Sequence, residues 1–170
     1  MPSLYKDMFP TRLRTNRLQN PLGVSRDLLR LSWEAAAGQE KFEIRLSEQR
    51  GTFQWTSGEI SSSEFHFTLP EEAGIRSRTA YIWQVRTWAG GEVSQWSDEA
   101  EFETNIDSSE WRARWIGASI SPTKIQTLYF RKEIEIPENV VSARAYSTAL
   151  GWYHLYINDS QVTGHSVVPR

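Results

Sequence analysis

Apolar and polar side chains alternate along most of residues 29–104, and this period of two constrains the fold more than any other feature of the sequence. Alternation of this kind puts one set of side chains on one face of a β-strand, and it predicts strands with a single buried face. The longest run, Thr79 to Ala89, places Tyr81, Trp83, Val85 and Thr87 on one face. The other alternating or strand-like runs are Leu29 to Glu34, Lys41 to Leu46, Glu64 to Leu69, Val93 to Trp96 and Ala100 to Thr104.

Short strands separated by glycine, serine and proline are typical of a β-sandwich of about 100 residues. Gly90-Gly91 reads as a hairpin turn after the longest strand. Helix signals are weak, because Gly38 interrupts the only alanine-rich stretch. We therefore predict an all-β chain that begins with a β-sandwich of about 100 residues.

A polar linker over residues 105–110 precedes a second β pattern, which we assign to residues 109–170. Leu128 to Ile136, Val140 to Thr148 and Gly151 to Ile157 are strand candidates, and Asn158-Asp159-Ser160 reads as a turn before a return strand at Gln161 to Thr163. The run Gly151 to Ile157 is apolar or aromatic on both faces, and such a strand needs cover on both sides. A sheet of three or four strands is only marginally stable by itself. We therefore expect that the second domain is truncated in this chain.

Composition excludes several classes of function. The 19 basic and 21 acidic residues give a net charge of −2, which argues against nucleic-acid binding. No cysteine and only three histidines are present, so we predict neither a metal site nor a cofactor. No apolar run has the length of a membrane span. The first ten residues lack a secretory signal, so we expect a cytoplasmic protein that does not contact a membrane.

A series of motifs occurs in a fixed order along the chain. The motifs are Arg14 to Gly23, Leu31-Ser32-Trp33, Trp55 to Ile60, Tyr81 to Arg86, Ser94 to Ser97, Ala100 to Thr104, Trp111 to Gly117 and Leu150 to Asn158. In their order and spacing they resemble the N-terminal region of bacterial α-L-rhamnosidases, which are large inverting glycoside hydrolases. The resemblance covers residues 12–170, although the turn at Asn158-Asp159 departs from the Asn-Gly that relatives commonly carry.

The resemblance implies a tail over residues 1–11, a fibronectin type III or immunoglobulin-like sandwich over residues 12–108, and the start of a jelly-roll accessory domain over residues 109–170. It also implies that catalysis, by an acidic general acid and base, belongs to an (α/α)6 barrel further along the same polypeptide. None of the family's catalytic residues matches a position in this sequence, so we predict no catalytic residue here and an inactive chain. The resemblance names rhamnosides as the carbohydrate that the parent enzyme handles, and the downstream catalytic domain as the partner of this chain.

The acidic pairs and the histidines read as surface groups. Glu71 and Glu72 lie in a predicted loop, Asp98 and Glu99 lie between strands, and Glu133 and Glu135 share the solvent face of a predicted strand. His66, His154 and His165 lie apart in the sequence, and no serine nucleophile elbow accompanies them. We interpret all of these carboxylates as solvated charge rather than as a general acid and base.

The unusual feature of the composition is its aromatic content of eight Trp, six Tyr and seven Phe. These rings either fill the core and the domain junction, which we favour, or stack on sugar rings. The candidates for carbohydrate binding are Trp88, Trp152 and Tyr153. Tyr81 fits the tyrosine corner of such sandwiches, with a structural role. Arg86 and Trp96 are expected to form a cation–π pair, as in the similar Ser-x-Trp-Ser run of cytokine-receptor modules.

Two functions from different classes stay open at this point. The first is a non-catalytic N-terminal portion of an α-L-rhamnosidase-like hydrolase, with a scaffolding or carbohydrate-positioning role. The second is a free-standing carbohydrate-binding or adhesion module. An enzyme that acts with these 170 residues alone is the third and weakest interpretation.

Overall fold

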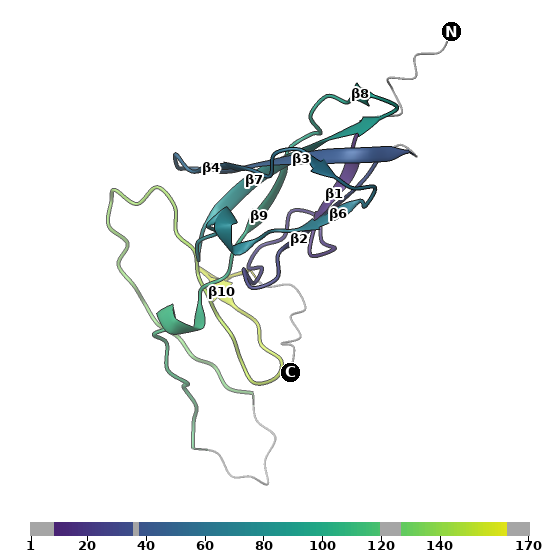
Figure 1. Ribbon diagram of the computed structural model, residues 1–170. Helices are drawn as coiled ribbons and strands as arrows, with labels where there is room; N and C mark the ends of the chain where they lie inside the picture. The colour runs from purple at the N-terminus through teal and green to yellow at the C-terminus, as the bar shows by residue number, and fades with distance from the viewer. Residues whose placement is uncertain (1–8, 36–37, 120–126, 163–170) are drawn as a thin grey trace. The chain divides into compact units, whose positions relative to one another are not determined.

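The computed structural model describes residues 9–35, 38–119 and 127–162 (Figure 1). The chain divides between Arg112 and Ala113 into two compact units, which are described separately here. Within the described residues the regular structure consists of β-strands and two short 3₁₀ helices, with no α-helix. The all-β prediction is confirmed.

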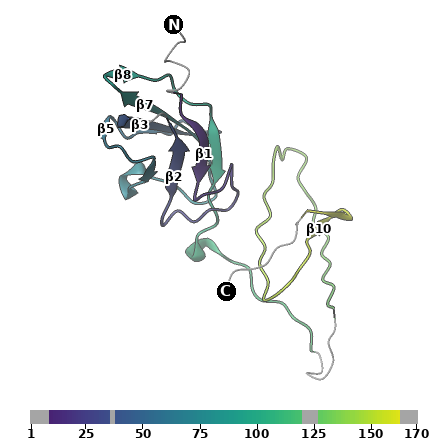
Figure 2. The ribbon, with the colours of Figure 1, turned by 90° about the vertical axis from the view of Figure 1, so that its right-hand side faces the viewer.

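The first unit contains two antiparallel sheets, with a pairing pattern typical of fibronectin type III sandwiches (Figure 2). The smaller sheet has the order β1-β2-β6, and it is formed by β1 (Thr11–Thr15), β2 (Arg30–Glu34) and β6 (His66–Thr68). In the larger sheet β4-β3-β7-β8 is the main path, β5 pairs with β3, and β9 pairs with β7. Its strands are β3 (Gln39–Glu48), β4 (Gln54–Thr56), β5 (Ile60–Ser61), β7 (Ala80–Ala89), β8 (Glu92–Val93) and β9 (Ala100–Glu103).

The core lies between the two sheets and consists of the side chains that the alternation placed on one face. Leu31 on β2, Ile44 on β3 and Val85 on β7 are fully buried. The indole of Trp83 is also fully buried, and its Nε1 donates to Oγ1 of Thr15 at 3.2 Å. Because Thr15 belongs to the smaller sheet and Trp83 to the larger one, this bond joins the two sheets across the core.

The tyrosine corner is present as predicted. The hydroxyl of Tyr81 accepts a hydrogen bond from the backbone amide of Arg76 at 2.8 Å, and the ring is buried against Phe102 with 5.2 Å between centroids. Arg76 and Gly74 lie just after the short helix η2 (Glu71–Ala73). The corner therefore fixes the connection between the two sheets at the start of β7.

The predicted strand Val93 to Trp96 is regular only at Glu92–Val93, and serine hydroxyls replace the rest of the ladder. Oγ of Ser94 accepts from the amide of Thr87 at 3.0 Å, and Oγ of Ser97 accepts from the amide of Val85 at 3.1 Å. The amides of the same two serines donate to the carbonyls of Thr87 and Val85, each at 2.8 Å. The segment thus stays attached to β7 without strand geometry.

Replacement of Ser97 by alanine is expected to lower the free energy of unfolding by about 1–3 kcal/mol, because the buried amide of Val85 loses its acceptor. Chemical denaturation followed by circular dichroism measures this difference. The matched control, Ser63→Ala, alters an exposed serine and is expected to change stability by less than about 0.5 kcal/mol. An equal effect of the two substitutions would contradict a structural role for the Ser97 hydroxyl.

The segment 20–24 runs along the outer edge of β9. The amide of Glu103 donates to the carbonyl of Pro21 at 3.0 Å, and the amide of Val24 donates to the carbonyl of Glu103 at 2.9 Å. The amide of Glu101 donates to Oδ1 of Asn20 at 3.0 Å. Irregular backbone therefore occupies the hydrogen-bonding groups on this side of β9.

Among residues 113–119 and 127–162, the regular structure of the second unit is the hairpin of β10 (Tyr156–Ile157) and β11 (Ser160–Gln161). Both turn residues have positive φ, 47° at Asn158 and 63° at Asp159, as a type I′ hairpin turn requires. The predicted turn and return strand are confirmed, although the strand predicted at Gly151 to Ile157 is regular only at Tyr156–Ile157, and Thr163 lies outside the described residues. No regular strand forms over 128–136 or 140–148 in the part of the chain that the structure describes, so the strands predicted there stay predictions.

Candidate functional site

The outer face of the larger sheet carries alternating arginine and tryptophan side chains, which we call the arginine–tryptophan ladder: Trp88, Arg86, Trp96 and Arg45. The guanidinium of Arg86 lies 4.7 Å from the ring centroid of Trp96 and 5.1 Å from that of Trp88. Arg45 covers Trp96 at 4.4 Å. The predicted pair of Arg86 and Trp96 is thus confirmed, as part of a longer stack than the sequence alone indicated.

The polar groups of this ladder bind one another. Nε of Arg86 donates to Oε2 of Glu43 at 2.7 Å, and a second nitrogen of the guanidinium lies 2.6 Å from the same oxygen. Arg45 donates twice to Oε1 of Gln84, at 2.9 and 2.6 Å. Thr56 donates to the other oxygen of Glu43 at 3.1 Å. Because these donors and acceptors are already used within the sheet, the arrangement stabilises the sandwich rather than presenting free groups to a ligand.

Sequence reasoning missed the two serines that hold Trp96 in this position. Ser94 and Ser97 flank the tryptophan and fix its backbone to β7 through their hydroxyls. The signal was present in the Ser-Gln-Trp-Ser spacing, which was interpreted only as a strand and a source of the cation–π pair. In a regular strand Ser94 and Ser97, three positions apart, would lie on opposite faces, whereas both serines are buried in the structure.

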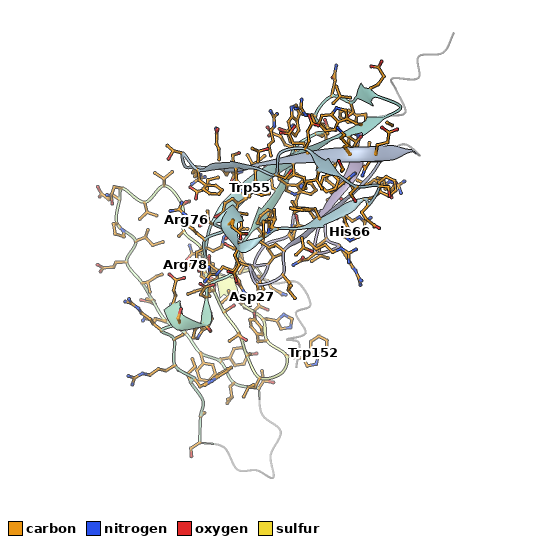
Figure 3. All side chains as sticks on the ribbon, in the orientation of Figure 1. Asp27, Trp55, His66, Arg76, Arg78 and Trp152 are labelled. Carbon is orange, nitrogen blue, oxygen red and sulfur yellow. The ribbon has the colours of Figure 1, made fainter. Side chains whose placement is uncertain are left out.

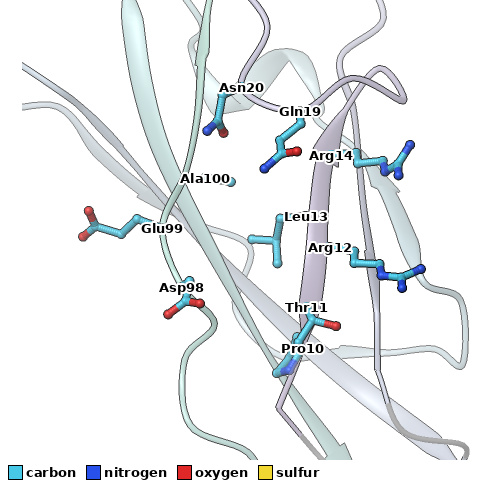
Figure 4. A pocket seen from close by; sticks show the side chains of 10 residues that line it. All are labelled: Pro10, Thr11, Arg12, Leu13, Arg14, Gln19, Asn20, Asp98, Glu99 and Ala100. Atoms are coloured by element: carbon cyan, nitrogen blue, oxygen red, sulfur yellow. The ribbon is translucent and has the colours of Figure 1, made fainter.

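Two shallow hollows lie on the first unit. One, of about 430 Å³, lies between β1 and the residues that lead into β9 (Figure 4). In that view Leu13 points toward Ala100, whereas the side chains of Arg12 and Arg14 point away from it. The other, of about 410 Å³, lies over the outer face of the larger sheet and includes Arg45 and Gln84, which bond to each other.

The carboxylates that were considered as a general acid and base lie on the surface. Such a pair stands about 6.5–9.5 Å apart across the bound sugar, with the acid in an environment that raises its pKa. All six candidates, Glu71, Glu72, Asp98, Glu99, Glu133 and Glu135, are exposed. The interpretation as solvated surface charge is confirmed.

The histidines that can be described have local partners. Nδ1 of His66 lies 3.4 Å from Glu64, and Nδ1 of His154 lies 2.9 Å from Nε2 of Gln161. His165 lies outside the described residues. Over residues 9–35, 38–119 and 127–162 no three His, Asp or Glu side chains gather as potential metal ligands. Nor does that part of the chain contain a helix long and apolar enough to cross a bilayer.

The three predicted carbohydrate-binding residues have different environments. Trp88 is half-buried on β7 and packs on Arg86. Trp152 is 72% exposed in the second unit (Figure 3). The hydroxyl of Tyr153 is 3.2 Å from Oγ of Ser147, and it lies 3.3 Å from the Ser147 carbonyl. Of the three, Trp152 offers the most open ring.

Comparison with known sequences places the first unit in a family. The sequence model of the family described as "Rha78A-like, N-terminal immunoglobulin domain" matches residues 10–108. An α-L-rhamnosidase of Alteromonas sp. (strain LOR) is 31% identical over 183 residues, covering 94% of this chain and 20% of that protein. An α-L-rhamnosidase of Streptomyces avermitilis is 25% identical over 178 residues, covering 85% of this chain and 17% of the relative.

This chain therefore spans about a fifth of the length of these curated relatives. Among solved structures, an α-L-rhamnosidase from Dictyoglumus thermophilum superposes with a TM-score of 0.57 over 64% of this chain and 14% of that one. The sequence identity in that superposition is 24%, so it supports the fold alone.

Proposed function

Because the chain belongs to the family of Rha78A-like N-terminal immunoglobulin domains, we propose that it is the non-catalytic N-terminal part of an α-L-rhamnosidase-like glycoside hydrolase. The observation that carries the proposal is the match to the Alteromonas relative, which covers 94% of this chain and so extends past the sandwich into the second unit. The partner of the chain is then the catalytic domain of the same polypeptide. The substrate of that whole enzyme is a terminal α-L-rhamnosyl residue.

The role of the sandwich in this proposal is scaffolding. Its core joins the two sheets through Trp83 and Thr15, and its outer face uses its charged groups in the arginine–tryptophan ladder. Both features favour a rigid module over a reactive one. Such a module contributes to the enzyme through the surface that it offers to neighbouring domains.

The proposal is tested by assaying the parent polypeptide with and without residues 1–112 on nitrophenyl α-L-rhamnoside. Deletion is expected to lower the temperature at which activity is lost, while nitrophenol release continues at low temperature. The purified 170-residue chain is expected to release no nitrophenol. Release by this chain alone, or a deletion that leaves thermal inactivation unchanged, would contradict the scaffolding role.

We further propose that residues 113–162 are part of a β domain completed by further strands of the polypeptide. The support is the exposure of apolar side chains that the sequence pattern assigns to strands, since a large exposed apolar surface marks a contact. Among them Tyr129 is 92%, Val141 is 91% and Trp152 is 72% exposed. A soluble unit of this size does not leave such side chains in water when its fold is complete.

The two units are therefore expected to melt differently when they are expressed apart. A piece spanning residues 1–112 is expected to give one cooperative thermal transition, because it holds the whole core of the sandwich. A piece spanning residues 113–170 is expected to give no cooperative transition in circular dichroism. A sharp melt of the second piece would show that it folds without further strands.

A second candidate, a carbohydrate-binding module, is favoured by one observation, the open ring of Trp152. Exposed indoles stack on the apolar faces of sugar rings. Titration of the full chain with L-rhamnose, followed by NMR, distinguishes the two candidates. Shifts that vanish in Trp152→Ala but persist in Trp88→Ala would support sugar binding, whereas unchanged spectra up to high millimolar sugar would favour scaffolding alone.

A further inference from the structure

The polar stretch after β9, expected from its sequence to be a linker, is bound to the sandwich along its length. The amide of Asn105 donates to the carbonyl of Val24 at 2.9 Å. The carbonyl of Asn105 accepts from the amide of Arg78 at 3.0 Å and from Oγ of Ser77 at 3.2 Å. The first residue of the stretch is therefore held from two sides of the sandwich.

Asp107 continues this attachment through a forked ion pair. Nε of Arg26 donates to Oδ1 of Asp107 at 2.9 Å, and a terminal nitrogen of the same guanidinium lies 2.6 Å from Oδ2. The amide of Asp107 donates to Oγ of Ser77 at 3.1 Å. A two-point contact between a guanidinium and a carboxylate fixes orientation as well as distance.

The last turn of the stretch, the short helix η3 (Ser108–Glu110), carries a second ion pair. A terminal nitrogen of Arg78 lies 2.9 Å from Oε1 of Glu110. Within the turn, the amide of Glu110 donates to the carbonyl of Asp107 at 3.0 Å, and the amide of Trp111 donates to the carbonyl of Ser108 at 3.3 Å. Arg26 and Arg78 are thus both bound to residues that leave the sandwich.

We infer that Arg26, Ser77 and Arg78 are positioning residues, which hold residues 105–111 as a rigid exit segment and so set the direction in which the chain leaves the sandwich. The inference rests on the proposed scaffolding function, since a scaffold that only tethered its neighbour would need no fixed exit. A flexible linker exposes its backbone to water, whereas three backbone groups of this segment make four hydrogen bonds to the sandwich. The exit segment therefore behaves as part of the first unit, which extends to Arg112.

Acid is expected to loosen the exit segment. The nearby Ser77 hydroxyl and then the Arg78 guanidinium lower the pKa of the Glu110 carboxyl. A lowered pKa means that the charged carboxylate stabilises the folded state. This stabilisation is complete at pH values above the pKa of the unfolded chain, about 4.3, and it is lost as the pH falls through the lower pKa of the folded state. The guanidinium of Arg26 interacts electrostatically with Asp107, with Asp27 and with Glu110, and so links the two ion pairs.

The test measures backbone ¹⁵N relaxation in the full 170-residue chain. Order parameters of residues 105–111 are expected to be about 0.85, as in rigid backbone, and to fall below about 0.6 in the double variant Asp107→Ala/Glu110→Ala. The matched control, Asp98→Ala/Glu99→Ala, removes the same charge from an exposed loop and is expected to leave the exit segment rigid. The variant residues lie outside the core, and unchanged amide spectra of β3 and β7 show that the sandwich stays folded.

Order parameters below about 0.6 in the unmodified chain would overturn the inference. So would an exit segment that stays rigid in the double variant, since the ion pairs would then not hold it. Ser77→Ala provides a second route, with loosening expected at Asn105 and Asp107. The proposed function fails by a different observation, the enzymatic and thermal results on the parent polypeptide, so the two failures can be told apart.

Discussion

Replacement of Trp83 by alanine is expected to lower the free energy of unfolding of the first unit by about 3–5 kcal/mol, the range found when large aromatic side chains are removed from cores. The indole is fully buried at the centre of β7 and packs in the core between both sheets. The substitution leaves a cavity and also leaves Oγ1 of Thr15 without its donor. Because small domains are stable by only about 5–15 kcal/mol, this loss removes a large share of the free energy of unfolding.

Urea denaturation followed by far-UV circular dichroism measures this effect as a shift of the midpoint. The control is Trp152→Ala, which removes the same side chain from a 72% exposed site and is expected to change stability by less than about 0.5 kcal/mol. A third variant, Trp83→Phe, keeps most of the volume and should recover most of the loss. Equal midpoints for the two alanine variants would contradict the assignment of Trp83 to the core.

Replacement of Arg86 by alanine is expected to give the second largest loss, about 2–3 kcal/mol. Two cation–π contacts disappear, each worth about 0.5–1 kcal/mol at a partly exposed site. The carboxylate of Glu43, with 15% of its side chain exposed, loses its cation, and an unpaired charge of this kind is costly. The pair is less buried than those for which about 3–5 kcal/mol is found, so the total stays below the effect of Trp83.

The conservative variant Arg86→Lys separates charge from shape. Lysine keeps the positive charge near Glu43 but cannot stack a planar group between Trp88 and Trp96. It is expected to recover about half of the loss in a thermal melt. The control Arg131→Ala breaks an ion pair whose side chains are 85% and 82% exposed, and surface pairs of this kind contribute about 0–1 kcal/mol. Full recovery by lysine would show that stacking adds nothing.

The core of the sandwich could be predicted from the sequence, because the two-residue alternation of apolar and polar side chains shows which face of each strand is buried. Residues such as Leu31, Ile44 and Val85 were assigned to the inner face by alternation, and each is fully buried. The tyrosine corner followed in the same way, since Tyr81 lies at the start of the longest strand. These predictions needed only local pattern and one general rule about sandwiches.

The parts that local pattern could not settle depend on contacts between distant residues. Residues 128–136 alternate well, yet a strand exists only where a second strand supplies its hydrogen bonds, and none of the described residues does so. The polar residues 105–110 looked like a free linker, because their partners Arg26 and Arg78 lie up to 81 positions away. Polar composition indicates that a segment can be exposed to water. It does not show which distant residues the fold brings into contact with that segment.

The same limit applies to the candidate site. Trp88 was proposed as a sugar platform because it points away from Trp83, and the structure confirms that it lies on the opposite face of β7. The sequence could not show that Arg86 already covers one face of its ring. Sugar binding by Trp88, Trp152 and Tyr153 stays a prediction.

The irregular segment along β9 has a consequence for behaviour at high concentration. An open strand edge accepts a strand from another molecule, which is how many β proteins polymerise. Here Asn20, Pro21 and Val24 already occupy the outward-facing groups of β9, so that a second molecule finds nothing to pair with on that side. Lengthening the loop that carries Asn20 should free this edge and raise the tendency of the sandwich to form fibrous aggregates.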